Sequence, residues 1–205
     1  MKKGLLTVVS GFSGAGKGTL MKGLLARYDN YALSVSMTTR AMRPGETEGV
    51  EYFFVTKEEF EKSIEEGKLI EHAQYVGNYY GTPRDYVFEQ LDAGKDVLLE
   101  IEIQGALQIK ERFPQALLLF VTTKDAQTLV NRLKGRGTED EETINKRLKR
   151  AAEESEGIEE YEYLIVNDDL DTCIEDMHDI IQKAKLKADR NIEFIEKIRK
   201  ELKDR

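Results

Sequence analysis

The sequence predicts an α/β fold in which helices cover both faces of a parallel sheet. Four short apolar runs are continuous rather than alternating, as is typical of parallel strands buried on both faces. They lie at residues 5–9, 97–101, 117–121 and 163–166. Helical patterns separate these runs, and alternating strands and helices favour right-handed βαβ units. A glycine-rich segment directly after the first run adds a phosphate-binding loop (P-loop) to this core.

Helices are predicted from apolar spacing around these strands. Leu20, Leu24, Leu25 and Tyr28 recur at helical spacing after the first strand, and a short pattern at 107–113 is ended by Pro114. From Asp171 onward the spacing predicts one long amphipathic helix. Its part beyond Asp189 either extends past the domain or packs on a partner.

Two stretches break the alternation of strands and helices. Residues 34–94 predict a small inserted α/β lobe, with strands at 51–55 and 69–76, a turn at Gly77-Asn78, and helices at 57–66 and from Pro83 to about Gly94. Residues 125–157 are charged and helical on either side of Gly135 and Gly137, which predicts a mobile helical lid. We therefore expect one domain over 4–185 and a C-terminal helical extension over 186–205.

The composition restricts the class of partner. The chain has 205 residues and a net charge of −8, which argues against a nucleic-acid or anionic-membrane binder. No run approaches the ~18 apolar residues that span a bilayer, and the lone Cys173 rules out an internal disulfide. We expect a soluble protein of the cytoplasm, and the sequence leaves its oligomeric state open.

The P-loop directly follows the first predicted strand and begins the first predicted helix. Glycines let successive backbone N–H groups turn inward, the following helix N-terminus adds partial positive charge, and Lys17 supplies a full charge for nucleotide phosphates. The nine expected ATP-binding residues are Gly11, Phe12, Ser13, Gly14, Ala15, Gly16, Lys17, Gly18 and Thr19.

One position departs from the usual P-loop. The residue after the lysine is commonly Ser or Thr, whose hydroxyl binds Mg²⁺, but here it is Gly18. Either Thr19 substitutes, or water and the nucleotide phosphates hold the Mg²⁺. We favour water, because Mg²⁺ gives up its hydration reluctantly.

Arginines form two groups that suit phosphoryl transfer, which needs positive charge around the transferring group. Arg40 and Arg43 lie in the lobe, and Arg132, Arg136 and Arg147 lie in the lid. In a helix, Arg132 and Arg136 would share a face. A monophosphate acceptor is mostly dianionic at neutral pH and needs no general base. The two histidines, His72 and His178, are therefore interpreted as lobe structure and as a helix-surface residue.

Several ordered segments together resemble the guanylate kinase family over about residues 4–185. Beyond the P-loop they are 36–40 with 43–46, 77–82, 100–105, 135–138 and 166–169. The Thr38-Thr39-Arg40 and 77–82 segments are far more specific than the P-loop. The resemblance implies ATP- and Mg²⁺-dependent phosphorylation of GMP in purine nucleotide metabolism and GMP recycling, with the lobe binding GMP.

The resemblance also implies roles for individual residues. Arg40, Arg43, Tyr52 and Tyr80 would hold the GMP phosphate, and Ser36, Glu71, Thr82 and Glu102 would surround the guanine. Lys17, Arg132, Arg136 and Arg147 would stabilise the transferring group. Glu100 is the candidate for contact with Mg²⁺, through water. The family more often carries Asp at the positions of Glu100 and Glu102, so their division of roles is less firmly implied than that of the arginines.

The chemistry of guanine independently suits Glu71. A carboxylate accepts hydrogen bonds from guanine N1–H and N2–H₂ together, whereas adenine presents an acceptor at N1. Two alternatives remain. One is another nucleoside monophosphate kinase such as an adenylate kinase, and the other is a non-catalytic guanylate-kinase-like binding module. The 77–82 segment and the context of Glu71 argue against the first, and the intact Gly16-Lys17 and lid arginines argue against the second.

Overall fold

The computed structural model describes residues 3–75, 77–135 and 141–205, and is built on a five-stranded parallel sheet. Its strands run in the order β2-β7-β1-β8-β9, and they comprise β1 (Leu6–Gly11), β2 (Tyr31–Leu33), β7 (Asp96–Glu100), β8 (Leu117–Thr122) and β9 (Tyr163–Val166). The four predicted strands are confirmed. Strand β2 was not predicted, because three residues are too few to establish a period.

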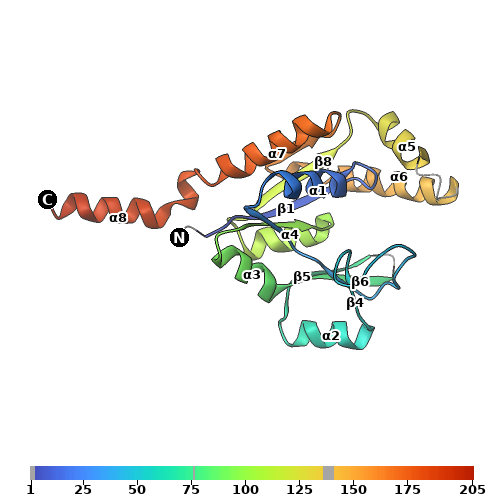
Figure 1. Cartoon of the computed structure of the whole chain (residues 1–205), viewed down its shortest axis with the longest axis horizontal. Coiled ribbons are helices and arrows are strands. Elements are labelled where there is room, and N and C mark those ends of the chain that lie inside the picture. The colour runs from blue at the N-terminus through green and yellow to red at the C-terminus, as the bar shows by residue number, and fades with distance from the viewer. Residues whose placement is uncertain (1–2, 76, 136–140) are drawn as a thin grey trace.

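Helices cover both faces of this sheet, as predicted (Figure 1). On one face, α1 (Lys17–Arg27) and α7 (Leu170–Ala184) bury their apolar residues against the sheet. On the other face, α3 (Arg84–Asp92) and α4 (Ile103–Arg112) do the same. Because all five strands are parallel, their carboxyl ends meet at one edge, which is where α/β sheets bind ligands.

The stretch after β2 forms a lobe with its own four-stranded sheet, in the order β4-β3-β6-β5. Its elements are β3 (Met37–Thr38), β4 (Phe53–Phe54), α2 (Lys57–Glu65), β5 (Leu69–Tyr75) and β6 (Asn78–Pro83). The strand expected at 51–55 is only two residues long, since it pairs with the two-residue β3 alone. Strands β3 and β6 were not predicted. Pro83 precedes the first residue of α3, which is where its fixed φ and missing N–H are tolerated.

The lid stretch contains α5 (Ala126–Gly135) and α6 (Glu141–Ser155). A small cluster of Leu129, Leu133, Ile144 and Ala151 holds the two helices together, and Phe12 of the P-loop packs against it. The lid and the P-loop therefore share an apolar contact, which ties the lid base to the core.

The prediction of one continuous helix from Asp171 was wrong. Helix α7 ends at Ala184, a 3₁₀ turn follows at Ala188–Arg190, and a separate helix α8 spans Ile192–Lys203. Asn191 occupies the break, where its side-chain Nδ2 donates to the carbonyls of Lys185 and Lys187 at 2.9 and 2.8 Å. These bonds satisfy the carbonyl at the C-cap of α7 and the carbonyl just before the 3₁₀ turn, so the chain can turn there. No helix in the described residues is both long enough and apolar enough to span a bilayer.

His178 is more than the surface residue that helical spacing suggested. Its ring stacks on Tyr28 with centroids 3.7 Å apart, and its Nδ1 hydrogen-bonds the Tyr31 hydroxyl at 2.9 Å. Gln182 links that hydroxyl to the fully buried carboxylate of Asp96, with which Lys185 forms an ion pair at 2.9 Å. This network joins α7 to the ends of α1, β2 and β7.

Candidate active site

A cleft of about 940 Å³ lies where the carboxyl edge of the main sheet, the lobe and the lid meet. Ser13 and Lys17 enter it from the P-loop, and Glu100 and Glu102 from the end of β7. Arg40, Arg43, Tyr52, Glu71 and Tyr80 enter it from the lobe, and Arg147, Arg150 and Glu154 from the lid. The structure thus brings side chains from four separate segments into one cavity.

The P-loop has the backbone form that anion binding requires. Gly16 has a φ of 93°, in the left-handed region, and α1 begins at the next residue, so the first turn of the helix opens into the loop. The Lys17 Nζ donates to the carbonyl of Gly11 at 2.7 Å and to that of Phe12 at 3.3 Å. A hollow of about 350 Å³ adjoins the loop, lined also by Gly18, Thr19 and Glu100.

Two lid arginines reach the P-loop directly. Arg132 donates to the carbonyls of Ala15 and Asn167 at 3.1 and 2.7 Å, and Arg147 donates to the Ser13 hydroxyl at 3.1 Å. The Asn167 Nδ2 also donates to the Ala15 carbonyl, at 2.7 Å. Arg136 lies outside the described residues, so its expected position on the same helical face as Arg132 is not tested.

The lobe presents a second cationic group. Arg40 forms a bidentate ion pair with Glu46, with nitrogen–oxygen distances of 2.7 and 3.0 Å, and its guanidinium lies 5.3 Å from the centre of the Tyr52 ring. Arg40 holds the pKa of the Glu46 carboxyl below its usual range. Tyr80 packs edge-on against Tyr52, with ring centroids 5.8 Å apart. Arg43 is exposed beside this group.

Glu71 is the most deeply buried carboxylate of the lobe, with 3% of its surface exposed. The Thr82 hydroxyl donates to its Oε1 at 2.5 Å. Burial raises the pKa of Glu71 to about 7, against the lowering effect of the Thr82 hydrogen bonds. At Gly105 a Cβ would lie 2.6 Å from the Glu71 Oε2, so a larger residue in the first turn of α4 would displace this buried carboxylate. Ser36 lines the same cleft as Glu71.

A carboxylate pair connects the lid to the core. Glu154 of α6 is 7% exposed and lies against Glu102, while the Arg150 Nε donates to its Oε1 at 3.0 Å. Burial and then the proximity of Glu102 raise the pKa of Glu154 to about 7, against the effect of Arg150. A protonated Glu154 can donate a hydrogen bond to Glu102, whereas two charged carboxylates this close would repel each other.

Glu154→Gln is expected to change how stability depends on pH. A carboxyl group whose pKa is raised by folding contributes stability below its unfolded pKa of about 4.3, and that stability is lost as the pH rises through the folded value. Between pH 5 and 8 the wild type should lose about 1–2 kcal/mol of unfolding free energy relative to Glu154→Gln. Denaturant unfolding across that range measures it, with Glu153→Gln as the exposed neighbouring control. Parallel pH profiles for wild type and Glu154→Gln would contradict a raised pKa of Glu154.

Few groups are available to hold a metal ion here. Among the described residues there is no cluster of three or more His, Cys, Asp or Glu side chains suited to one. Glu100 and Thr19 both border the hollow beside the P-loop. A Cβ at Gly18 would meet nothing within 4 Å. The hollow beside the P-loop is open and offers few oxygen ligands. It therefore suits an ion that keeps most of its waters and is bound through nucleotide phosphates.

Several residues of the cleft were not predicted from the sequence, or were predicted without a role. Glu46 lies in the 43–46 segment of the resemblance but was given no role. No local pattern distinguishes Glu154 from the many other acidic residues. Ser34 lines the cleft with a buried hydroxyl that has no hydrogen-bond partner among the described residues. For Asn167 a signal existed, because it directly follows β9 at the carboxyl edge of the sheet.

Comparisons with known proteins agree on one family. The family model described as guanylate kinase matches residues 3–184. A protein of Clostridioides difficile named guanylate kinase is 51% identical over 204 residues, covering 98% of this chain and 99% of that protein. Its counterpart in Oceanobacillus iheyensis is 48% identical over 197 residues, covering 96% of each. The crystal structure of guanylate kinase from Anaplasma phagocytophilum superposes with a TM-score of 0.76 at 34% identity, over 92% of this chain and 90% of that one.

Proposed function

Because the chain belongs to the guanylate kinase family, we propose that it transfers the γ-phosphoryl group of ATP to GMP, forming ADP and GDP. The observation that carries this proposal is the single cleft shared by the P-loop, the arginine group of the lobe and the buried Glu71. Phosphoryl transfer between two nucleotides needs both phosphate sites to open into one cavity, so that donor and acceptor can meet in line.

ATP is proposed to bind at the P-loop, residues 11–19. The backbone N–H groups at the start of α1 would hold its β-phosphate, and Lys17 would turn from the loop carbonyls to the β- and γ-phosphates. Arg132 and Arg147 already contact the loop at Ala15 and Ser13, and would neutralise charge on the transferring group. Arg136 is proposed to join them. Mg²⁺, bound with ATP beside Glu100, would neutralise phosphate oxygens.

GMP is proposed to bind in the lobe. Arg40, Arg43, Tyr52 and Tyr80 would hold its phosphate, with Arg40 released from part of its pairing with Glu46. The acceptor oxygen needs no deprotonation, because a phosphate monoester is mostly dianionic at neutral pH. The lobe and lid would close over both nucleotides and exclude the water that otherwise hydrolyses ATP.

The guanine is proposed to be selected by Glu71 with Ser36, Thr82 and Glu102 around it. An ionised Glu71 accepts from N1–H and N2–H₂ together, whereas adenine N1 would place a lone pair against that charge. A buried carboxylate left without donors is strongly unfavourable, so this site would reject AMP.

The affinity for GMP is expected to rise with pH. Only ionised Glu71 accepts both donors, and its pKa near 7 leaves it mostly protonated at pH 6. The dissociation constant of GMP should fall about 10-fold from pH 6 to pH 8 and then level off. Calorimetric titration with GMP alone measures it. In Glu71→Gln only the smaller effect of phosphate ionisation should remain, so equal pH dependence in both proteins would remove Glu71 from the base site.

Product analysis tests the reaction itself. The protein is incubated with ATP, Mg²⁺ and GMP, and the nucleotides are separated by chromatography. We expect ADP and GDP in equal amounts, and no ADP without GMP. ADP formed without GDP would replace the kinase by an ATPase, and no turnover by folded protein would favour a non-catalytic binding module.

The setting follows from these substrates. We propose that the protein works in the cytoplasm, in purine nucleotide metabolism and the recycling of GMP, where ATP, GMP and Mg²⁺ are available. Its partners would be these small molecules rather than nucleic acid or membrane, in keeping with the net charge of −8.

A further inference from the structure

Asn167 is a buried residue that the proposed phosphoryl transfer does not use. Only 6% of its surface is exposed, and its side-chain Nδ2 donates to the carbonyl of Ala15, which is fully buried, at 2.7 Å. A Cβ at Gly16 would lie 2.5 Å from the same Nδ2, so the amide packs directly on the loop backbone. Asn167 therefore contacts the peptide that joins Ala15 to Gly16, although 152 positions separate it from Ala15 in sequence.

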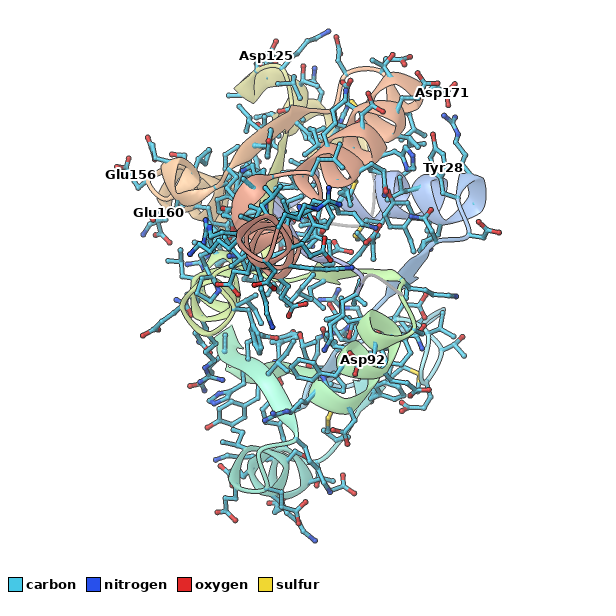
Figure 2. All side chains as sticks on the ribbon, turned by 90° about the vertical axis from the view of Figure 1, so that its left-hand side faces the viewer. Tyr28, Asp92, Asp125, Glu156, Glu160 and Asp171 are labelled. Atoms are coloured by element: carbon cyan, nitrogen blue, oxygen red, sulfur yellow. The ribbon has the colours of Figure 1, made fainter. Side chains whose placement is uncertain are left out.

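The backbone of Asn167 is fixed between a strand and a helix. Its N–H donates to the carbonyl of Thr122 at 2.8 Å, which extends the pairing of β8 and β9 by one residue. Two residues later Asp169 caps α7, because its carboxylate accepts from the Thr172 N–H at 2.9 Å. Figure 2 shows Asp171 in the first turn of that helix. The amide of Asn167 therefore acts on the loop from a rigid base.

The orientation of the peptide between Ala15 and Gly16 decides whether the loop presents a donor or an acceptor to an anion. In a trans peptide the carbonyl and the N–H point in opposite directions, so a carbonyl held by Asn167 turns the Gly16 N–H away from Asn167. Gly16 has a φ of 93° and lines the hollow beside the P-loop. Because glycine rotates at little steric cost, this peptide could otherwise flip and present the Ala15 oxygen to a phosphate.

Arg132 is the second side chain that holds the Ala15 carbonyl. Its Nη1 donates to that carbonyl at 3.1 Å, and its Nη2 donates to the backbone carbonyl of Asn167 at 2.7 Å. In the proposed reaction Arg132 turns to the transferring phosphoryl group, and both of these bonds are then lost. The Asn167 amide is the one remaining side-chain donor to the Ala15 carbonyl among the residues that the structure describes.

We propose that Asn167 is a positioning residue for the triphosphate of ATP. Its amide holds the peptide between Ala15 and Gly16 in the orientation that binds anions, after Arg132 has turned to the transferring group. The inference rests on the proposed function for the movement of Arg132. Because Asn167 acts through the loop backbone, its contribution to binding should be the same for every ligand that carries a triphosphate, with or without a base.

Calorimetric titration of the full chain with ATP and with inorganic tripolyphosphate, each with Mg²⁺, tests the proposal. Asn167→Leu keeps the branched shape of the side chain and removes the donor, so both dissociation constants should rise by the same factor of about 10. Asn167→Asp replaces the donor by an acceptor and should weaken both ligands at least as much. The dissociation constant of GMP, measured in the same way, should stay unchanged in both variants.

Asp168→Asn is the matched control. Asp168 is the neighbouring residue, and its exposed carboxylate pairs with Lys124 at 3.0 Å, away from the loop peptide. All three dissociation constants should therefore stay at their wild-type values. Circular dichroism and denaturant unfolding check that each variant is folded. In steady-state kinetics Asn167→Leu should raise KM for ATP and leave KM for GMP unchanged.

Several outcomes would overturn the proposal. Weaker ATP binding with unchanged tripolyphosphate binding would assign the amide to the base or ribose of ATP. An equal loss of affinity for ATP and GMP would reduce Asn167 to a residue of the general fold. Wild-type affinity for tripolyphosphate in both variants, or a wild type that binds ATP but no tripolyphosphate, would also contradict it. These are binding measurements, so a failure to form GDP would contradict the proposed function separately.

Discussion

Lys17→Met is expected to lower turnover about 10³-fold while changing the unfolding free energy by less than about 1 kcal/mol. The Lys17 ammonium is half-buried, and its contacts with two loop carbonyls place it at the P-loop rather than in the apolar core. Its removal takes a full positive charge from the phosphates of ATP. Methionine retains the alkyl stem and a similar volume, so packing against the loop is preserved.

Lys22→Met is the matched control for Lys17. Lys22 comes from the second turn of α1, borders the same hollow and is exposed. Its loss should cost less than about tenfold in turnover, because exposed charges are screened. Comparison of kcat and unfolding curves for the two variants separates chemistry from general electrostatics. Near wild-type turnover in Lys17→Met would remove it from the mechanism.

Arg40→Met is expected to lower kcat/KM for GMP about 10²- to 10³-fold. The Arg40 guanidinium is held over the Tyr52 ring and paired with Glu46, so it is oriented before a phosphate arrives. Its loss also leaves Glu46 unpaired at the phosphate site, which adds repulsion. Steady-state kinetics with varied GMP and saturating ATP measures the effect, and KM for ATP should change little.

Two controls isolate the role of Arg40. Arg84→Met removes an arginine that begins α3 and lies over the Phe88 ring, and it should leave kcat/KM unchanged. Arg40→Met combined with Glu46→Gln removes the unpaired carboxylate and should recover part of the loss. If the single variant retained near wild-type kcat/KM, the lobe arginine group would not be the acceptor-phosphate site.

The parts of the fold that the sequence predicted are those encoded locally. The P-loop follows a buried strand and begins a helix, so residues 11–19 carry the pattern within a single short stretch. The long apolar strands behave in the same way. Strands β2, β3 and β6 were missed because short strands, or strands rich in Gly and Tyr such as 78–83, are defined by their partners rather than by periodicity.

In the candidate site, too, the sequence predicted locally encoded features and missed contacts between distant residues. Roles for Arg40, Glu71 and Thr82 came from resemblance, and only the structure adds their mutual contacts. The pairing of Glu154 with Glu102 joins residues 52 positions apart, and nothing near either residue in sequence marks it. His178 illustrates the same limit, because helical spacing gives its face but not the tyrosines that α1 and β2 bring against it.

The most direct test of the account is the release of ADP from ATP and Mg²⁺ with GMP, AMP, CMP and UMP offered in turn. Guanine recognition by a buried carboxylate predicts turnover with GMP and a kcat/KM at least about 10³-fold lower with each of the others. Comparable turnover with AMP would retain the cleft and its phosphoryl-transfer chemistry but contradict the assignment of Glu71 as the residue that selects the base.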